Sequence, residues 1–352
     1  MSADDRFTGT REVDPRHAPD EARLTRWLEQ NVEGFEGPLR LRQFKGGQSN
    51  PTFEVTAASG TYVLRRKPPG PLLPSAHAVD REYRVISALW SAGFPVPRPY
   101  GLCTDDSVIG SMFYVMEKVE GRILWNLSLP DQSPEQRRAI YLSQIDTLAH
   151  LHRLDPEALG LADFGREGNY FARQVTRWTR QYQASETETI SEMDRLMAWL
   201  PGGLPPERPA RIVHGDFRLD NLVLSHDGPQ VKAVLDWELS TLGDPMADFS
   251  YFLIAWAIPA SERNGIGGLD LAALGIPSIE EAVEHYAKAT GARPDNLDWL
   301  MAYNLFRLAA ICQGIAGRVR DGTAASAHAL SMAERVRPLA QAAMSFAVRA
   351  GA

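Results

Sequence analysis

The sequence predicts an α+β fold with two lobes: a small N-terminal lobe with an antiparallel β-sheet and a helix, and a larger, mainly helical C-terminal lobe. Runs rich in β-branched and aromatic residues occur in the first 120 residues, whereas apolar residues at helical spacing dominate the rest. Between Arg211 and Trp237 a short island of apolar runs, separated by turn residues, interrupts the helices. The change of period marks the two lobes, and the island marks a compact β segment inside the second.

The composition indicates a protein that folds without a disulfide framework or a structural metal site. The chain has 352 residues and only two cysteines, Cys103 and Cys312, which we expect to be buried thiols in a reducing interior. A net charge of -7 gives no basic excess, so we expect no nucleic-acid partner. The polar, acidic N-terminus does not resemble a signal peptide, and no stretch reaches about eighteen uninterrupted apolar residues. We therefore expect a cytoplasmic protein with no membrane partner.

The N-terminal part is predicted to consist of a flexible leader, residues 1–16, and a sheet-based lobe, residues 17–120. Two strands joined by the turn at 57–60 form a hairpin, and helices flank it. The elements predicted here are a helix at 19–32, strands at 52–56 and 61–66, a helix at 75–90 and a strand at 112–119.

The C-terminal lobe is predicted to start at Gly121 and to cover residues 121–352. Apolar residues at helical spacing, with Pro and Gly at the breaks, indicate a series of helices. The helices predicted here are 134–153, 170–184, 187–200, 245–258 and a long terminal pair from 295 onward.

The island carries acidic and amide side chains. If its hairpin turns at Gly228-Pro229, antiparallel pairing places Asn221 opposite Asp236, with Cα atoms about 5 Å apart. Two such oxygen ligands, together with phosphate and water, suit Mg²⁺. Asp216 on the preceding loop is left to orient an attacking hydroxyl group and to accept its proton. Each residue alone is equally typical of a turn, but the ordered set favours a phosphoryl-transfer site.

The same stretch resembles the catalytic and metal-binding loops of the aminoglycoside phosphotransferase and choline kinase group, relatives of protein kinases. His214-Gly215-Asp216 is similar to their replacement for the kinase His-Arg-Asp, and Asn221 follows at the expected distance. Asp236-Trp237-Glu238 is similar to their replacement for Asp-Phe-Gly, and the run 243–248 matches their Gly-Asp-Pro-x-x-Asp.

This resemblance implies a bilobal protein-kinase-like fold and transfer of phosphate from ATP or GTP, with Mg²⁺, to a small-molecule hydroxyl. It implies that Asp216, Asn221 and Asp236 are catalytic, with Asn221 and Asp236 binding the metal. His214 and Asp248 are expected to support the catalytic loop, and Asp244 to cap the following helix.

The resemblance also assigns nucleotide-binding roles in the N-terminal lobe. A glycine turn at 45–50 offers backbone N–H groups to phosphate, although such turns are also typical of plain hairpins. Arg65 takes the place of the kinase strand lysine, Glu82 that of its helix partner, and Met116 to Val119 that of the hinge. An exposed helix charge is the alternative for Glu82. The nucleotide-binding residues are then Gly46, Gly47, Ser49, Asn50, Arg65, Glu82, Met116, Glu117 and Val119.

Asp163-Phe164-Gly165 copies the kinase triplet but precedes His214 and follows no hairpin, so we interpret it as a loop. Four runs, at 65–70, 73–77, 107–110 and 168–182, resemble phosphotransferases fused to, or encoded beside, acyl-CoA dehydrogenases. This favours a hydroxyacyl acceptor, including a CoA thioester, and a functional link to an acyl-CoA dehydrogenase. Candidates for an acceptor pocket are Tyr170, Arg173 and Trp178, although such residues at helical spacing are also typical of a core and its rim.

Three functional hypotheses remain. The first is a small-molecule kinase. The second is a catalytically silent nucleotide-binding relative, because Arg65 replaces a lysine. The third is an aminoglycoside kinase, which would favour a strongly acidic C-terminal pocket, whereas residues 295–352 mix both signs of charge. The lack of Gly-Lys-Ser or Gly-Lys-Thr disfavours a P-loop NTPase, and the lack of Ala-Pro-Glu disfavours a protein kinase.

Overall fold

The computed structural model of the chain describes residues 9–14, 18–45, 50–68, 77–262, 264–322 and 329–352. The chain divides into two units, each made of several segments. The first unit comprises Met1–Trp125, Ala158–Leu161 and Asp220–Ser240. The second comprises Asn126–Glu157, Ala162–Leu219 and Thr241–Ala352. The predicted α+β class is confirmed, because an antiparallel sheet dominates the first unit and helices dominate the second.

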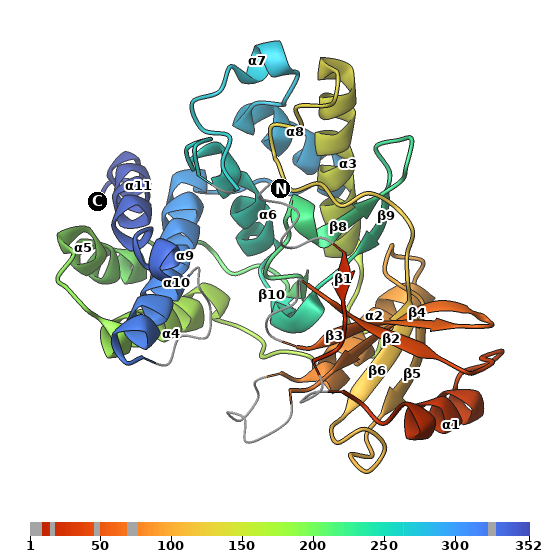
Figure 1. Ribbon diagram of the computed structural model, residues 1–352. Coiled ribbons are helices and arrows are strands. Elements are labelled where there is room, and N and C mark those ends of the chain that lie inside the picture. The colour runs from red at the N-terminus through yellow and green to blue at the C-terminus, as the bar shows by residue number, and fades with distance from the viewer. Residues whose placement is uncertain (1–8, 15–17, 46–49, 69–76, 263, 323–328) are drawn as a thin grey trace. The chain divides into compact units, whose positions relative to one another are not determined.

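The first unit is built on a six-stranded antiparallel sheet with strand order β1-β2-β3-β4-β6-β5 (Figure 1). Phe53 and Val55 alternate along β3 and are fully buried, as are Leu64 and Val115 on neighbouring strands, so one face of the sheet covers a core. The strands are β1 (Thr10–Arg11), β2 (Arg40–Phe44), β3 (Thr52–Ala57), β4 (Gly60–Arg66), β5 (Pro99–Cys103) and β6 (Phe113–Glu117).

Two helices complete this part of the unit. In α1 (Glu21–Asn31), Asp20 caps the N-terminus by accepting a hydrogen bond from the Arg23 N–H, so the helix starts two residues later than predicted. The buried face of α2 (Val79–Ser91) includes Glu82 among apolar residues at helical spacing. The predicted start of this helix at residue 75 falls in 69–76, outside the described residues.

A short strand occurs in the segment predicted to be a flexible leader. Thr10 and Arg11 form β1 and pair with Phe44 and Gln43 of β2. The Arg42 guanidinium also donates to the Thr10 hydroxyl at 2.8 Å. These contacts hold Thr10 and Arg11 at the edge of the sheet.

The hairpin β8 (Leu222–Leu224) and β9 (Val231–Val234) belongs to the first unit, although the sequence predicts that it groups with the residues after Gly121. A β-bridge joins Leu224 to Arg122, and the Val234 N–H donates to the Pro95 carbonyl at 2.8 Å. A Cβ at Gly121 would lie 2.2 Å from the Leu224 oxygen, so only glycine permits this approach. Backbone hydrogen bonds therefore attach the hairpin to the sheet unit.

The second unit consists of helices and one small two-stranded sheet. Ser133 forms a capping box at the start of α3, and the Asp244 carboxylate accepts a hydrogen bond from the Met246 N–H at 2.8 Å to cap α6, as predicted. Its elements are α3 (Pro134–Arg153), α4 (Tyr170–Ser185), α5 (Ser191–Trp199), η3 (Leu200–Gly203), β7 (Arg211–Val213), β10 (Thr241–Gly243), α6 (Pro245–Leu253), η6 (Ile254–Trp256), α7 (Leu271–Leu274), α8 (Ile279–Thr290), α9 (Leu297–Arg320), α10 (Ala329–Ala333) and α11 (Val336–Arg349).

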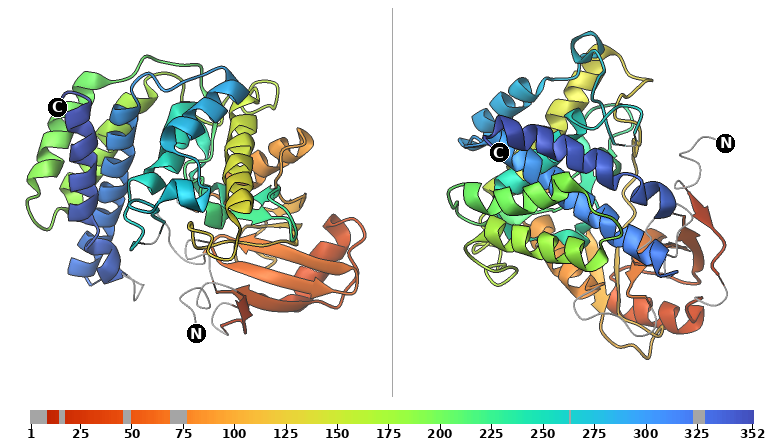
Figure 2. Two further views of the ribbon diagram at one scale, coloured as in Figure 1. Left: turned by 90° about the horizontal axis from the view of Figure 1, so that it is seen from above. Right: turned by 90° about the vertical axis from the view of Figure 1, so that its left-hand side faces the viewer.

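The core of the second unit surrounds α9, which contacts α4, α6 and α11. Figures 1 and 2 show α9 and α11 side by side, as expected for the terminal helix pair. The pairing of β7 with β10 was not predicted, because each strand has only three residues. Within the described part of the chain, no helix is both long enough and apolar enough to span a bilayer.

Candidate active site

The first unit contains a buried ion-pair cluster around Arg65. Its Nε lies 2.8 Å from Glu82 Oε2, and its Nη2 lies 2.7 Å from Asp236 Oδ1 and 3.2 Å from Glu238 Oε2. Arg65 is on β4, Glu82 on α2, and both acidic partners follow β9, so the cluster joins three segments distant in sequence. The structure thus brings together Arg65, Glu82 and Asp236, and it adds Glu238.

Glu82 is held by neutral groups as well as by Arg65. Its Oε1 accepts a hydrogen bond from Asn50 Nδ2 at 2.7 Å, and its Oε2 accepts one from the Tyr114 hydroxyl at 3.1 Å. The Asn50 side chain in turn contacts His77 Nδ1 at 3.0 Å. Glu82 is 1 % exposed, which rules out the alternative of a solvated helix charge.

Burial and charge set the protonation of this cluster. Burial raises the pKa of Glu82 to about 7. Arg65 lowers this pKa, but the negative charges of Asp236 and Glu238 oppose the effect of Arg65. Burial alone would lower the pKa of Arg65, but attraction by Glu82, Asp236 and Glu238 outweighs it and raises that pKa. Three carboxylates thus face one guanidinium, which leaves an excess of negative charge.

Such an excess fits a divalent cation. Asp236 and Asn221 lie at the same end of the β8–β9 hairpin and supply the carboxylate and amide oxygens that Mg²⁺ prefers. Among the described residues no group of three or more His, Cys, Asp or Glu could hold a metal ion. A magnesium site here would therefore take one or two ligands from the protein and the rest from phosphate and water.

The register of the hairpin corrects one prediction. Leu222 pairs with Val234, and the Leu235 N–H donates to the Asn221 carbonyl at 2.8 Å, so Asn221 lies opposite Leu235 and not Asp236. The reason is the turn: a Ser225–Gln230 hydrogen bond closes a longer loop than the predicted two-residue one, and a bulge follows Val223. The shift amounts to one residue.

Asp236 itself has a left-handed backbone, with φ 65° and ψ 64°. This conformation is uncommon outside glycine and is best tolerated by Asp and Asn. It ends β9 and starts the short helix η5 (Trp237–Leu239), whose Trp237 indole N–H donates to the Val234 carbonyl at 2.9 Å. The turn places Asp236 and Glu238 together on Arg65.

The remaining nucleotide-binding candidates are placed only in part. Gly46, Gly47 and Ser49 lie outside the described residues. Met116 and Glu117 end β6 opposite Val63 and Tyr62 of β4, and Val119 follows in the segment leading to Gly121. The Glu117 N–H donates to the Arg98 carbonyl at 2.8 Å, so this N–H is engaged within the sheet.

The second unit holds the loop with Asp216. Asp248 of α6 accepts hydrogen bonds from the backbone N–H groups of His214 and Gly215, the latter at 2.7 Å. Gly215 has φ 84°, a conformation that favours glycine, and the His214 ring accepts from the Asp216 N–H at 3.2 Å. Both supporting candidates, His214 and Asp248, therefore contact the backbone of this loop.

Three further residues hold the loop and were not predicted. The Tyr251 hydroxyl donates to Asp216 Oδ1 at 2.6 Å, and Arg218 Nε lies 3.0 Å from the same oxygen. Arg307 Nη2 donates to the Gly215 carbonyl at 2.7 Å. Arg218 had a detectable signal, because it stands two residues after Asp216. Tyr251 and Arg307 had none, because they reach the loop from α6 and α9.

The three predicted acceptor residues differ in their surroundings. Arg173 donates to the backbone carbonyls of Arg166 and Glu167 at 2.8 and 3.2 Å, so its guanidinium is engaged on its own loop. Trp178 is 8 % exposed and donates through Nε1 to Gln174 at 3.2 Å. Tyr170 lines a pocket of about 230 Å³ at the start of α4.

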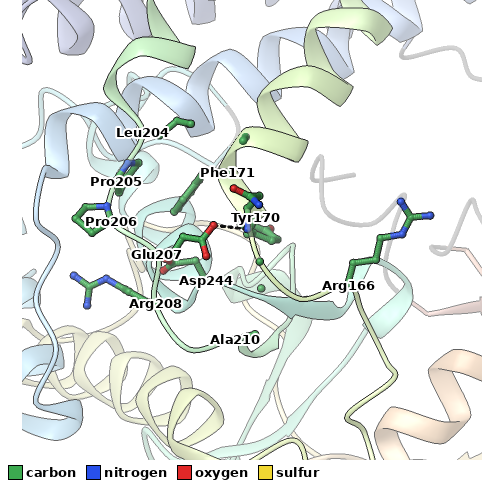
Figure 3. Close-up of a pocket in the computed structure, with 14 residues that line it drawn as sticks. Arg166, Tyr170, Phe171, Leu204, Pro205, Pro206, Glu207, Arg208, Ala210 and Asp244 are labelled. Atoms are coloured by element: carbon green, nitrogen blue, oxygen red, sulfur yellow. Dashed lines mark hydrogen bonds between the residues drawn. The ribbon is translucent and has the colours of Figure 1, made fainter.

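Figure 3 shows this pocket, with Glu207 directed at the N-terminal end of α4. There its carboxylate accepts a hydrogen bond from the Asn169 N–H at 2.7 Å. The loop with Asp163-Phe164-Gly165 lies nearby in sequence between α3 and α4, as predicted, and a Cβ at Gly165 would meet the backbone of β10. The Asp163 triplet therefore packs within the second unit, whereas the β8–β9 hairpin belongs to the first.

Comparison with known proteins decides the family. The profile of a phosphotransferase enzyme family matches residues 40–298, which is well over half of the chain. The chain belongs to this phosphotransferase enzyme family. A Mus musculus relative, acyl-CoA dehydrogenase family member 10, is 46% identical over 318 residues, covering 90% of this chain and 30% of the mouse protein. The chain thus spans less than half the length of that relative.

Solved structures agree with the phosphotransferase assignment. A crystal structure from Ralstonia eutropha, provisionally described as an aminoglycoside phosphotransferase, is 49% identical, has a TM-score of 0.88 and covers 94% of this chain and 99% of that one. A thermostable mutant of an aminoglycoside phosphotransferase, in ternary complex with ADP and hygromycin B, is 14% identical with a TM-score of 0.59, covering 93% of this chain and 98% of that one. The latter likeness supports the kinase-like fold.

Proposed function

We propose that this phosphotransferase is a small-molecule kinase that moves the γ-phosphoryl group of ATP or GTP to a hydroxyl group. The observation that carries the proposal is the cluster around Arg65, in which a strand cation meets the helix carboxylate Glu82 and the post-hairpin carboxylate Asp236. A buried, charged arrangement of this kind costs desolvation energy and serves no packing need, so it favours a functional role. It gathers one cation for phosphate and an acidic group for a metal ion.

On the nucleotide side, Arg65 would bind phosphate oxygens and Glu82 would orient it, with Asn50 holding Glu82 in place. Asn221 and Asp236 would hold Mg²⁺, which when bound neutralises charge on the nucleotide phosphates. The solved aminoglycoside phosphotransferase with ADP supports a nucleotide co-substrate for this family member. The hinge residues Met116, Glu117 and Val119 stay candidates for the base.

On the acceptor side, Asp216 would accept the proton of the attacking hydroxyl as its oxygen forms a bond to the γ-phosphorus and the bond from phosphorus to the nucleotide diphosphate breaks. Tyr251 and Arg218 fix Oδ1 of Asp216, and Asp248 fixes the backbone of its loop. These contacts restrict the carboxylate to one orientation, which is what a proton acceptor requires.

The acceptor class we favour is a hydroxyacyl compound, as the free acid or a CoA thioester. The mouse relative's name supports a link to acyl-CoA dehydrogenase chemistry. An aminoglycoside acceptor is the second candidate, favoured by the description of the Ralstonia eutropha structure. A polycationic acceptor would sit poorly beside Arg307, which is buried near the Asp216 loop.

The test is a screen of hydroxyacids, hydroxyacyl-CoA thioesters and aminoglycosides for magnesium-dependent release of ADP or GDP. An Asp216→Asn variant should lose transfer by at least about a hundredfold, the usual effect of a general base, while its nucleotide affinity stays within about twofold. Turnover retained in that variant would remove Asp216 from its role. Nucleotide binding without transfer to any acceptor class would favour the catalytically silent alternative.

A further inference from the structure

Arg307 lies on α9 in an unusual electrostatic setting. Its side chain is 8 % exposed, and within the described part of the chain no carboxylate lies within ion-pair distance of it. Its contacts are the Gly215 carbonyl, to which Nη2 donates at 2.7 Å, and the rings of Trp178 and Tyr251, whose centroids lie 5.7 and 5.3 Å from Cζ. A buried cation without an ion-paired partner is costly, and the carbonyl and aromatic contacts, with the more distant Asp248 carboxylate, offset only part of that cost.

Tyr303, one helical turn before Arg307, carries a polar group without a partner among the described residues. It is fully buried, and its hydroxyl has no hydrogen-bond partner among the described residues. Residues four apart on a helix share a face, so this hydroxyl and the guanidinium are neighbours. An unpaired buried hydroxyl costs about 1–3 kcal/mol, so its position beside a guanidinium that lacks an ion-paired carboxylate indicates a ligand that contacts both groups.

The position of Arg307 and Tyr303 relative to Asp216 indicates which part of the ligand they contact. The Tyr251 hydroxyl donates to Asp216 Oδ1, while the face of the same ring contacts the Arg307 guanidinium. Arg307 is therefore separated from the proton acceptor by about the length of one aromatic side chain. Aromatic rings of Trp178, Tyr251 and Phe171, which meets Tyr303 edge-on with ring centroids 5.3 Å apart, surround the pair.

We propose that Arg307 and Tyr303 form an anion subsite that binds the carboxylate of the acceptor while Asp216 receives its hydroxyl group. The acceptor class is then a short hydroxycarboxylate: the guanidinium supplies the counter-charge, the tyrosine hydroxyl donates one hydrogen bond, and the rings contact the carbon chain. This subsite rests on the proposed kinase function for the second half of its role, whereas carboxylate binding itself does not depend on transfer. It replaces Arg173, whose guanidinium is engaged on backbone carbonyls.

Binding is measured first, without catalysis. The full-length protein is titrated with hydroxycarboxylates of increasing chain length, and binding is followed by tryptophan fluorescence or by isothermal titration calorimetry. The matched probes are the methyl esters and the thioesters of the same acids. We expect the free acids to bind, and Arg307→Gln to weaken them at least about tenfold, as for loss of a charge-assisted hydrogen bond. Esters and thioesters should bind the wild type more weakly than the free acids do, and the variant should reduce their affinity by a smaller factor.

Tyr303→Phe keeps the test valid if Arg307→Gln does not fold. Removal of an unpaired buried hydroxyl should leave the melting temperature unchanged or higher, yet weaken the free acid by about threefold to tenfold. The matched control is Arg337→Gln, which removes an exposed guanidinium paired with Glu188 in the same unit. It should leave acid binding unchanged.

The outcomes separate the two proposals. Acid binding that depends on Arg307, without any phosphate transfer, supports the subsite and contradicts the kinase function. Phosphate transfer to neutral acceptors that is indifferent to both variants supports the kinase and overturns the subsite. If Arg307→Gln reduces the affinity for the acid and for the thioester equally, the proposal of an anionic acceptor is contradicted. Loss of nucleotide affinity in Arg307→Gln would show that the guanidinium binds phosphate instead.

Discussion

Arg65 makes three ion pairs, and lysine would not replace it. A guanidinium presents its donors as a planar fork, so Nε meets Glu82 while Nη2 meets Asp236 and Glu238. A lysine ammonium is a single point charge and cannot reach both sides with the same geometry. The arginine is matched here by a further carboxylate, Glu238, which lies beside Asp236 at Nη2.

Arg65→Met should destabilise the protein by about 3–5 kcal/mol, because it leaves the buried Glu82 without its cation. Arg65→Lys should fall between the wild type and Arg65→Met. Urea unfolding of the three proteins measures this directly. A methionine variant within about 0.5 kcal/mol of the wild type would mean that the cluster does not stabilise the fold.

Glu82 predicts a pH dependence. Its pKa is about 7 in the folded protein against 4.5 for an unperturbed glutamate, so between these values the folded state binds more protons than the unfolded state. Stability contributed at Glu82 is thus greatest at low pH and falls as pH rises from about 4.5 to 7, by about 3 kcal/mol in all. The stability advantage of wild type over Glu82→Gln should shrink over this window and stay constant above it.

Unfolding curves of both proteins at about pH 5, 6, 7 and 8 provide the measurement. Glu82→Gln keeps the size of the side chain but loses the titration, so only the difference between the curves reports on Glu82. A difference that is flat with pH would contradict the raised pKa.

At the scale of residues, sequence patterns predicted those site members that occur in contiguous motifs. Arg65, Glu82 and Asp236 stand at fixed positions relative to strand, helix and hairpin, and the structure brings them together. The sequence did not predict Tyr251 and Arg307 as site residues, because a tyrosine and an arginine at helical spacing are also typical of a core and its rim. Only the packing of α6 and α9 against the Asp216 loop gives them their partners.

Among the elements, the β8–β9 hairpin depends on one close backbone approach. Gly121 lets the following strand-like segment bridge to Leu224, and Arg122 extends the contact by donating from Nε to the Ser225 carbonyl at 2.9 Å. Residues 121 and 122 therefore hold strand β8 of the hairpin that precedes Asp236.

Gly121→Ala should destabilise the protein by about 1–3 kcal/mol, because its Cβ would lie 2.2 Å from the Leu224 oxygen and 2.6 Å from Val223 Cγ1, atoms that cannot move away cheaply. Thermal unfolding followed by circular dichroism gives the measurement. Gly202→Ala is the control, since no heavy atom lies within 4 Å of a Cβ there. Equal melting temperatures for both variants would show that the hairpin tolerates displacement.

Element prediction succeeded where the period was long and failed where pairing was short. The helix at 134–153 was predicted with both ends correct, because Ser133-Pro134 marks its start and twenty residues carry its pattern. Strands β7 and β10 have three residues each, too few for a period to emerge. The hairpin register was wrong by one residue because a bulge and a turn cannot be told apart from residue types alone.

For the molecule as a whole, the sheet unit is discontinuous in sequence. Its last described segment, Asp220–Ser240, comes from the middle of the chain and supplies Trp237, whose ring meets Phe94 edge-on with centroids 6.0 Å apart. The chain must therefore leave the sheet unit and return to it before that unit is complete.

A fragment ending at Trp125 should not fold into a stable unit. It lacks the partners of Arg65 at Asp236 and Glu238, and it exposes the Pro95 carbonyl and the Phe94 ring that the hairpin covers. Circular dichroism and proton–nitrogen correlation spectra of the fragment, compared with the full chain, test this. A cooperative thermal transition in the fragment would contradict it.

The left-handed backbone of Asp236 bears on which substitution should test the proposed metal-binding role of this carboxylate in crystals with nucleotide. Alanine at this position would remove the charge and also force a Cβ-bearing residue without a locally bonding side chain into αL, which costs on the order of 1 kcal/mol. Asparagine tolerates the same dihedral angles and deletes only the ionic function. A trapped state of the asparagine form would thus report chemistry alone, undistorted by a loop that has relaxed into a different path.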